Sequence, residues 1–73
     1  MIEYLVIYEP GDDNWSAYVP DLPGCVTTGK DRDETEANMR EAIAMHLSAL
    51  REAGEAVPAP AGEAGYLRVS SST

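Results

Sequence analysis

A helical repeat of apolar residues from about residue 32 to 53 is the feature that most limits how this chain can fold. Its apolar stripe is formed by Met39, Ile43, Leu47 and Leu50. Asp31, three residues before Glu34, is an aspartate form of the capping box that begins helices, and Gly54 is suited to end the helix. Such a helix takes nearly a third of the 73 residues, so the remaining elements must pack against its single apolar stripe.

Three short segments before this helix have the composition of β-strands. They cover residues 2–9, 15–19 and 25–29, and they are rich in β-branched and aromatic residues. Turn residues at 10–14 and the two prolines within 20–24 separate them, which favours an antiparallel meander. After the helix, residues 55–65 form a Pro/Gly/Ala linker, and residues 66–69 have the composition of a last strand.

These elements predict one α+β domain over residues 1–73. We expect an antiparallel three- to four-stranded sheet with one long helix on one face, in the order β-β-β-α-β. Leu47 is expected to lie within the core between the helix and the sheet.

The chain is strongly acidic, and its charge restricts the partners it can bind. Thirteen Asp and Glu residues oppose five Lys and Arg residues, for a formal net charge of −8. This charge repels the nucleic-acid backbone, so we expect no direct DNA or RNA binding, whereas a basic protein would be attracted.

The cellular compartment is inferred from cysteine usage and from the distribution of apolar residues. Cys25 is the only cysteine, so no internal disulfide can form, which fits a reducing compartment. No window approaches 18 apolar residues, and no basic run precedes an apolar stretch at the N-terminus. We therefore expect a cytoplasmic protein with neither a signal peptide nor a membrane-spanning segment.

Catalytic, cofactor and metal sites are not supported by any motif in the sequence. The carboxylates near the turns and the helix start lack the spacing of a calcium loop and are expected to form turns and caps. His46 is the only histidine and lies beside the apolar stripe, where a partly buried side chain is the simpler interpretation. Cys25 has no second cysteine nearby and is expected to contribute to packing. We therefore expect a protein that is not an enzyme and binds no cofactor.

A binding role is favoured because one helix can cover only one face of the sheet. In the first strand Tyr4, Val6 and Tyr8 alternate with Leu5 and Ile7, so both faces are apolar. The uncovered face should meet a partner or a second copy, and we expect at least a homodimer. The candidate contact residues are Tyr4, Val6, Tyr8, Trp15, Tyr18 and Met45.

The segment from Val19 to Cys25 reads Val-Pro-Asp-Leu-Pro-Gly-Cys and resembles the hallmark of the HicB-like antitoxin family. The resemblance continues through the helix start at residues 31–34, the helix centre at 40–43 and the Val-Pro-Ala-Pro exit at 57–60. We expect structural roles for the motif residues, with Asp21 capping the turn by accepting backbone N–H bonds. These residues are Pro20, Asp21, Leu22, Pro23, Gly24, Cys25, Gly29 and Glu34.

The resemblance implies a partial RNase H-like fold without a nuclease site. It further implies an antitoxin of a type II toxin–antitoxin pair, which binds and neutralises a small basic mRNA-cleaving toxin, a HicA-like mRNA interferase. Many family members add a C-terminal DNA-binding module, which a chain ending at Thr73 is expected to lack. Arg32, Thr35 and Glu36 depart from the family pattern at the helix start. A stand-alone structural homo-oligomer with no toxin partner remains the alternative.

Overall fold

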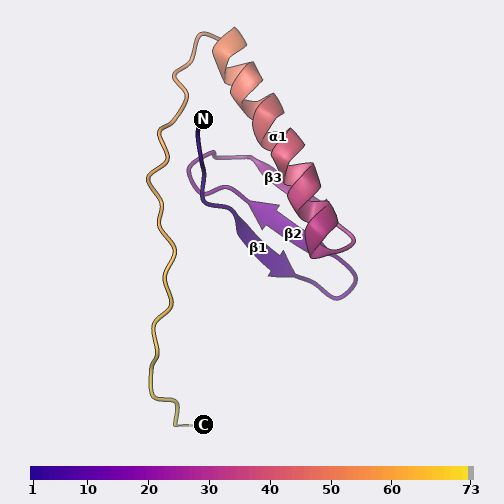
Figure 1. Cartoon of the computed structure of the whole chain (residues 1–73), viewed down its shortest axis with the longest axis vertical. Helices are drawn as coiled ribbons and strands as arrows, with labels where there is room; N and C mark the ends of the chain where they lie inside the picture. The colour runs from indigo at the N-terminus through magenta and orange to yellow at the C-terminus, as the bar shows by residue number, and fades with distance from the viewer. Residues whose placement is uncertain (73) are drawn as a thin grey trace.

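The computed structural model describes residues 1–72 and has an α+β architecture, as predicted (Figure 1). Three strands precede one long helix along the chain. They are β1 (Ile7–Pro10), β2 (Trp15–Tyr18), β3 (Val26–Gly29) and α1 (Arg32–Glu52).

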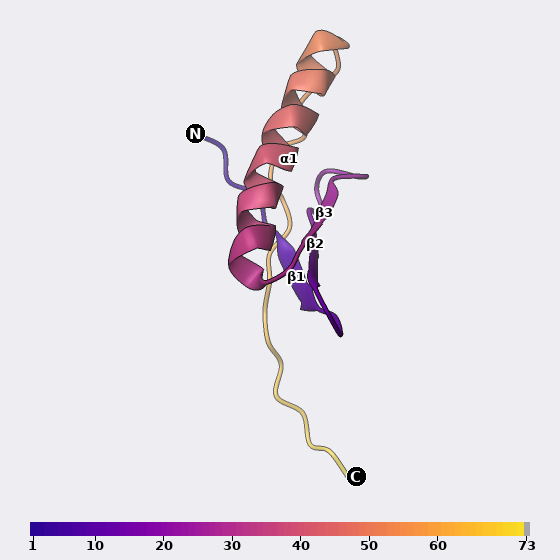
Figure 2. The ribbon, with the colours of Figure 1, turned by 90° about the vertical axis from the view of Figure 1, so that its right-hand side faces the viewer.

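The three strands form an antiparallel meander in the order β1-β2-β3. The register aligns Ile7 of β1 with Tyr18 of β2 and Val26 of β3, so these three residues form one row across the sheet. The helix packs on one face of the sheet and leaves the other face uncovered (Figure 2). This arrangement confirms the predicted placement of the helix.

The first strand is shorter than the predicted range of 2–9, because β1 begins only at Ile7. Extending the register by two residues would place Leu5 opposite Pro20, which has no N–H group to donate to a ladder. The chain of β2 turns away at that point, so residues 2–6 have no strand beside them. The other two strands lie within their predicted ranges.

The helix begins and ends as its capping residues predicted. The backbone N–H of Glu34 donates to Oδ1 of Asp31 at 2.8 Å, and Oε1 of Glu34 accepts from the N–H of Lys30 at 2.8 Å. At the other end Ala53 is the C-cap, and Gly54 follows with a φ of 72°, a left-handed conformation that glycine adopts easily.

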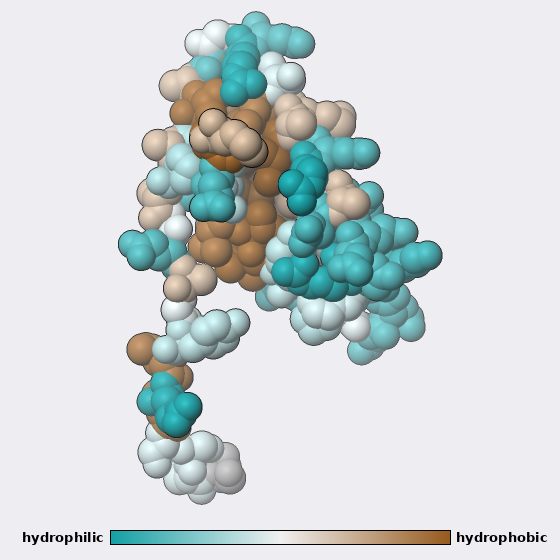
Figure 3. Space-filling model, viewed as in Figure 1, coloured by the Kyte–Doolittle hydropathy of each residue, from teal (hydrophilic) through white to brown (hydrophobic). Residues whose placement is uncertain are grey.

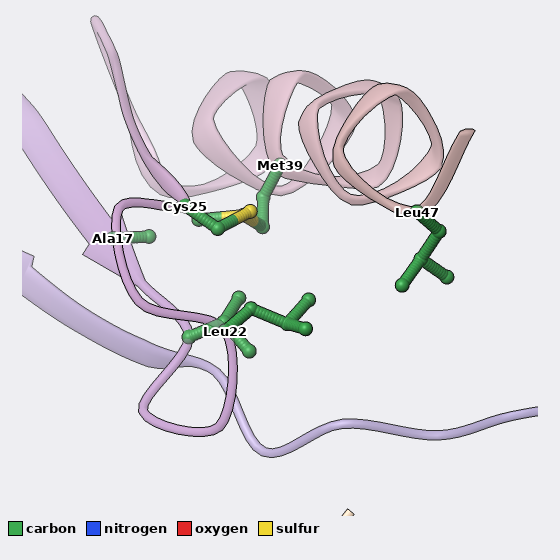
Figure 4. Packing of buried hydrophobic residues seen from close by; sticks show 6 residues of the cluster. Ala17, Leu22, Cys25, Met39 and Leu47 are labelled. Carbon is green, nitrogen blue, oxygen red and sulfur yellow. The ribbon is translucent and has the colours of Figure 1, made fainter. Parts of the chain in front are cut away.

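The core lies between the helix and the sheet and includes three residues from the connection between β2 and β3, namely Val19, Leu22 and Cys25 (Figure 4). Leu22, from that connection, is completely buried, and Met39 of α1 is nearly so. The Sγ atom of Cys25 lies 4.0 Å from the Sδ atom of Met39. The buried apolar residues are Ala17, Val19, Leu22, Cys25, Met39 and Leu47.

Residues 66–69, which the sequence predicts as a last strand, have no regular secondary structure here. The chain leaves α1, passes beside the N-terminal segment and continues beyond the sheet without regular secondary structure (Figure 1). Tyr66 and Leu67 are almost completely exposed. A strand requires a neighbouring strand that takes up its backbone hydrogen bonds, and within the described residues 1–72 no strand lies beside residues 66–69.

Candidate protein-binding site

The loop from Pro20 to Gly24 closes on itself through backbone hydrogen bonds. The N–H of Leu22 donates to the carbonyl of Val19, and the N–H of Cys25 donates to the carbonyl of Leu22, each at 3.0 Å. Gly24 has a φ of 86°, which a residue with a side chain adopts only with strain. The loop therefore inserts Leu22 into the core and leaves Pro20 and Pro23 on the surface.

Asp21 does not cap this turn, which corrects the expectation from sequence. Its Oδ2 atom instead accepts hydrogen bonds from the N–H groups of Ala61 at 2.9 Å and Gly62 at 3.0 Å. Two N–H groups of the loop already donate to backbone carbonyls, which leaves the carboxylate to bind the chain after the helix. The partners lie about forty residues away in sequence, so no local pattern could reveal them.

A second hydrogen bond holds the same part of the tail against the N-terminal segment. The Tyr4 hydroxyl donates to the carbonyl of Pro58. A Cβ placed on Gly62 would lie 3.5 Å from Cδ2 of Leu5, so Gly62 also lies against this segment. Residues 57–62 are thus attached to the body of the protein, whereas the chain after them extends away from it (Figure 1).

Removing the Asp21 carboxylate should release this part of the tail without unfolding the protein. In Asp21→Ala the amides of Ala61 and Gly62 lose their acceptor. We expect the ¹⁵N heteronuclear NOE of these two amides to fall clearly, while the helical circular dichroism signal is retained. Asp12→Ala, which removes an exposed carboxylate from the turn after β1, is the control. Unchanged NOE values in Asp21→Ala would contradict this role for Asp21.

The same attachment should depend on pH. The N–H groups of Gly62 and Ala61 hold the pKa of Asp21 below its ordinary value because they donate to the ionised carboxylate. A group with a lowered folded-state pKa contributes its stabilisation above its unfolded pKa and loses it as the pH falls through the folded pKa. We therefore expect the amide shifts of residues 61 and 62 to be constant above about pH 5 and to move below about pH 4. In Asp21→Asn this titration should be absent.

Gly29 and Thr35 allow the helix to start directly against β3. A Cβ on Gly29 would lie 2.6 Å from both the backbone N and the Oγ1 atom of Thr35. Thr35 is completely buried, and its hydroxyl donates to the carbonyl of Asp31 at 2.7 Å. Nδ2 of Asn38 donates to the carbonyl of Thr28 at 2.9 Å and joins the helix to the strand again.

The six candidate contact residues lie on three different surfaces: the helix side of the sheet, the uncovered face of the sheet and the outer surface of α1. The side chains of Tyr4, Val6 and Tyr8 are partly buried and pack against the core, so they lie on the helix side of the sheet. Trp15 shares this side with Ala17, because alternate residues of a strand face the same way. Tyr18 lies on the uncovered face and is 40% exposed, and Met45 lies on the outer surface of α1 and is 72% exposed.

The uncovered sheet face has one apolar row and one polar row. The apolar row is formed by Ile7, Tyr18 and Val26, and the exposed fraction of Val26 is 65%. The polar row is formed by Glu9, Ser16 and Thr28. Val26 was not among the candidate contacts, although its position next to the buried Cys25 indicates that it faces away from the core.

A second surface feature is a groove between α1 and the N-terminal segment. Figure 3 shows an apolar band there, and its lining includes Ile2, Val6 and Ile43. Glu36 pairs at this rim with Arg32 at 3.0 Å and with Arg40 at 3.4 Å. The Arg32 guanidinium also lies 3.7 Å from the centre of the Tyr8 ring. Arg32 and Glu36 therefore interact with each other at the surface.

The described residues 1–72 contain no cluster of three His, Cys, Asp or Glu side chains that could hold a metal ion. Burial raises the pKa of the Cys25 thiol, which keeps it protonated and weakly reactive. His46 is half-buried beside Leu47. Within the same residues, no helix is long and apolar enough to cross a membrane.

Comparison with known proteins identifies the family. The model of the HicB-like antitoxin of bacterial toxin–antitoxin systems matches residues 4–68, which include the motif loop, the helix and most of the tail. The chain belongs to this family. Its membership agrees with the resemblance seen in the motif from Val19 to Cys25.

Three relatives of this HicB-like chain show how widely the sequence pattern occurs. A UPF0150 protein of Thermoplasma acidophilum is 36% identical over 58 residues, which cover 78% of this chain and 84% of the relative. A UPF0150 protein of Helicobacter pylori is 41% identical over 44 residues, 60% of this chain and 61% of the relative. A 14.9 kDa protein of Haemophilus phage HP1 is 34% identical over 55 residues, 75% of this chain and 41% of the relative. No solved structure matches the chain significantly.

The family of this HicB-like chain consists of antitoxins, which are generally not enzymes and which act with a toxin partner. A surface that can bind another protein is therefore the kind of functional site expected in this chain. The uncovered sheet face and the apolar groove are the two such surfaces described above.

Proposed function

We propose that this HicB-like protein is an antitoxin that binds a small basic, mRNA-cleaving toxin of the HicA-like type and neutralises it by direct contact. The single observation that carries this proposal is the uncovered sheet face with its exposed apolar row. Family membership supports a toxin partner in general. The identity of the toxin and the direct contact are our proposal.

The apolar row is suited to form the centre of a protein interface. Tyr18 and Val26 are exposed, while the helix occupies the opposite face and cannot cover them. Aromatic residues surrounded by smaller apolar ones are common at the centres of interfaces, because burying them removes much apolar surface from water.

The charges around this face favour a basic partner. Glu9 lies in the polar row of the face, and Asp12 and Asp13 lie in the turn after β1. Together with a net charge of −8, these carboxylates would attract a basic toxin and speed its association, most strongly at low ionic strength. The same charge would oppose nucleic acid, so we propose that the protein acts on the toxin and not on its RNA substrate.

The proposal is tested by co-expressing the protein with any small basic protein that is encoded beside its gene. The wild-type chain should restore bacterial growth, and the two proteins should elute together on a sizing column. Tyr18→Arg and Val26→Arg each place a positive charge on the apolar row and should weaken the complex by at least about tenfold in Kd. Met45→Arg makes the same change on the outer surface of α1 and should leave binding unchanged.

Growth that is not restored, with no complex formed, would reject the antitoxin proposal for that pair. Equal binding by Val26→Arg and the wild type would assign the interface to another surface. An isolated gene, together with a stable oligomer that ignores basic proteins, would favour the alternative of a structural homo-oligomer in the cytoplasm.

A further inference from the structure

Residues 66–69 have the composition of a strand but are not part of the sheet in this structure. Tyr66, Leu67 and Val69 are exposed, and the segment extends away from the body of the protein in both views (Figures 1 and 2). Large apolar side chains in an extended, unpaired segment favour pairing with the edge of a sheet.

The outer edge of β1 is available for such pairing. β1 is an outer strand of the order β1-β2-β3, and within residues 1–72 no further strand lies on its outer side. An outer strand exposes backbone N–H and carbonyl groups that can bind an added strand.

The tail of the same chain is poorly placed to fill this edge. Gly62 is held beside Leu5, and from there the tail and the N-terminal segment run in the same direction (Figure 1). If Gly62 is aligned with Leu5 and the two segments continue residue by residue, residues 64–67 would lie beside β1. That pairing would include Ala64 and Gly65, which are both poor strand formers. Arg68 and Val69 would pass beyond the end of the strand at Pro10.

The edge of a second copy is free of this restriction and carries complementary charge. The described residues 66–72 contain Arg68 and no acidic residue. In contrast, β1 ends at Glu9 and Pro10, and the turn that follows contains Asp12 and Asp13. A tail that adds to this edge would bring Arg68 close to these carboxylates, while the acidic bodies of the two chains stay further apart.

We propose that two copies of this chain exchange their tails, so that residues 66–69 of each add as a strand to the outer edge of β1 in the other. The interaction is symmetric, because each chain gives one tail and receives one. Asp21 and Tyr4 hold residues 58–62 on the parent chain and set the point from which the tail departs. The exchange leaves the uncovered sheet face free and is independent of the proposed toxin binding.

The mass in solution is the first test. Light scattering at tens of micromolar protein should give twice the chain mass of 7.9 kDa for the wild type. Leu67→Pro removes a backbone donor and the strand geometry, and should raise the dimer Kd at least about tenfold. Ala64→Pro, a proline in the same tail but outside the exchanged segment, should remain dimeric. Val26→Arg should also remain dimeric, which separates this result from that of toxin binding.

Contacts between the chains are the second test. In a mixture of ¹³C-labelled and unlabelled protein, filtered NOEs should connect the methyl groups of Leu67 and Val69 with protons of Ile7 and Tyr8 in the other chain. A monomeric wild type would overturn the proposal. A dimer that Leu67→Pro leaves intact, or NOEs found only within one chain, would overturn it as well.

Discussion

Leu47→Asp is expected to leave the protein largely unfolded at 25 °C. Leu47 is only 6% exposed and is the buried residue of α1 nearest its C-terminal end. The substitution removes apolar burial from the core and places a carboxylate there without a partner, for a cost of about 4 kcal/mol or more. A single core of this size supplies only about 3–5 kcal/mol, so little stability would remain.

Urea denaturation followed by circular dichroism measures this effect. Met45→Asp is the matched control, since it introduces the same charge two residues away at a position that is 72% exposed. We expect this control to change the free energy of unfolding by less than about 0.5 kcal/mol. Equal stabilities for the two variants would mean that the helix presents another side to the sheet.

Gly29→Ala is expected to destabilise the protein by about 1–3 kcal/mol, the range typical of overpacking. The new Cβ would lie 2.6 Å from the backbone N of Thr35 and 2.9 Å from its Cα, so the start of the helix must move away from β3. Such a shift would also weaken the hydrogen bond from Asn38 to Thr28. The midpoint of thermal unfolding reports the change.

Gly65→Ala is the control, because a Cβ at that position meets no atom within 4 Å. Its stability should be unchanged or slightly increased, since alanine restricts the unfolded chain. Adding Thr35→Ala to Gly29→Ala removes the contact with Oγ1 but keeps the contact with the backbone N. The double variant should therefore stay less stable than Thr35→Ala alone, and full recovery would contradict the backbone clash.

The helix was the most predictable element because its signals are local. The capping pair of Asp31 and Glu34 lies within one turn, and the apolar stripe repeats with the helical period. The predicted range of 32–53 differs by one residue from the observed Arg32–Glu52. The same stripe correctly placed Met39 and Leu47 in the core.

The strands were less predictable because each depends on its neighbour. Residues 2–6 have the composition of a strand, yet the register brings Leu5 opposite Pro20 and β1 stops short. Residues 66–69 likewise have no strand beside them within the described part of the chain, and they form no regular secondary structure. β-propensity reports how well a side chain fits a sheet, and it does not state whether a sheet edge is present to receive it.

The sequence by itself determined the helix, the order of the strands, the acidic charge and the family motif, since all of these depend on composition or on residues close together in the chain. Only the tertiary structure decided the partner of Asp21, which binds the amides of Ala61 and Gly62. It also decided that Tyr4, Val6 and Tyr8 pack toward the helix while Tyr18 and Val26 face outward. Alternation separates two faces of a strand but cannot assign them, because the choice depends on where a distant helix packs.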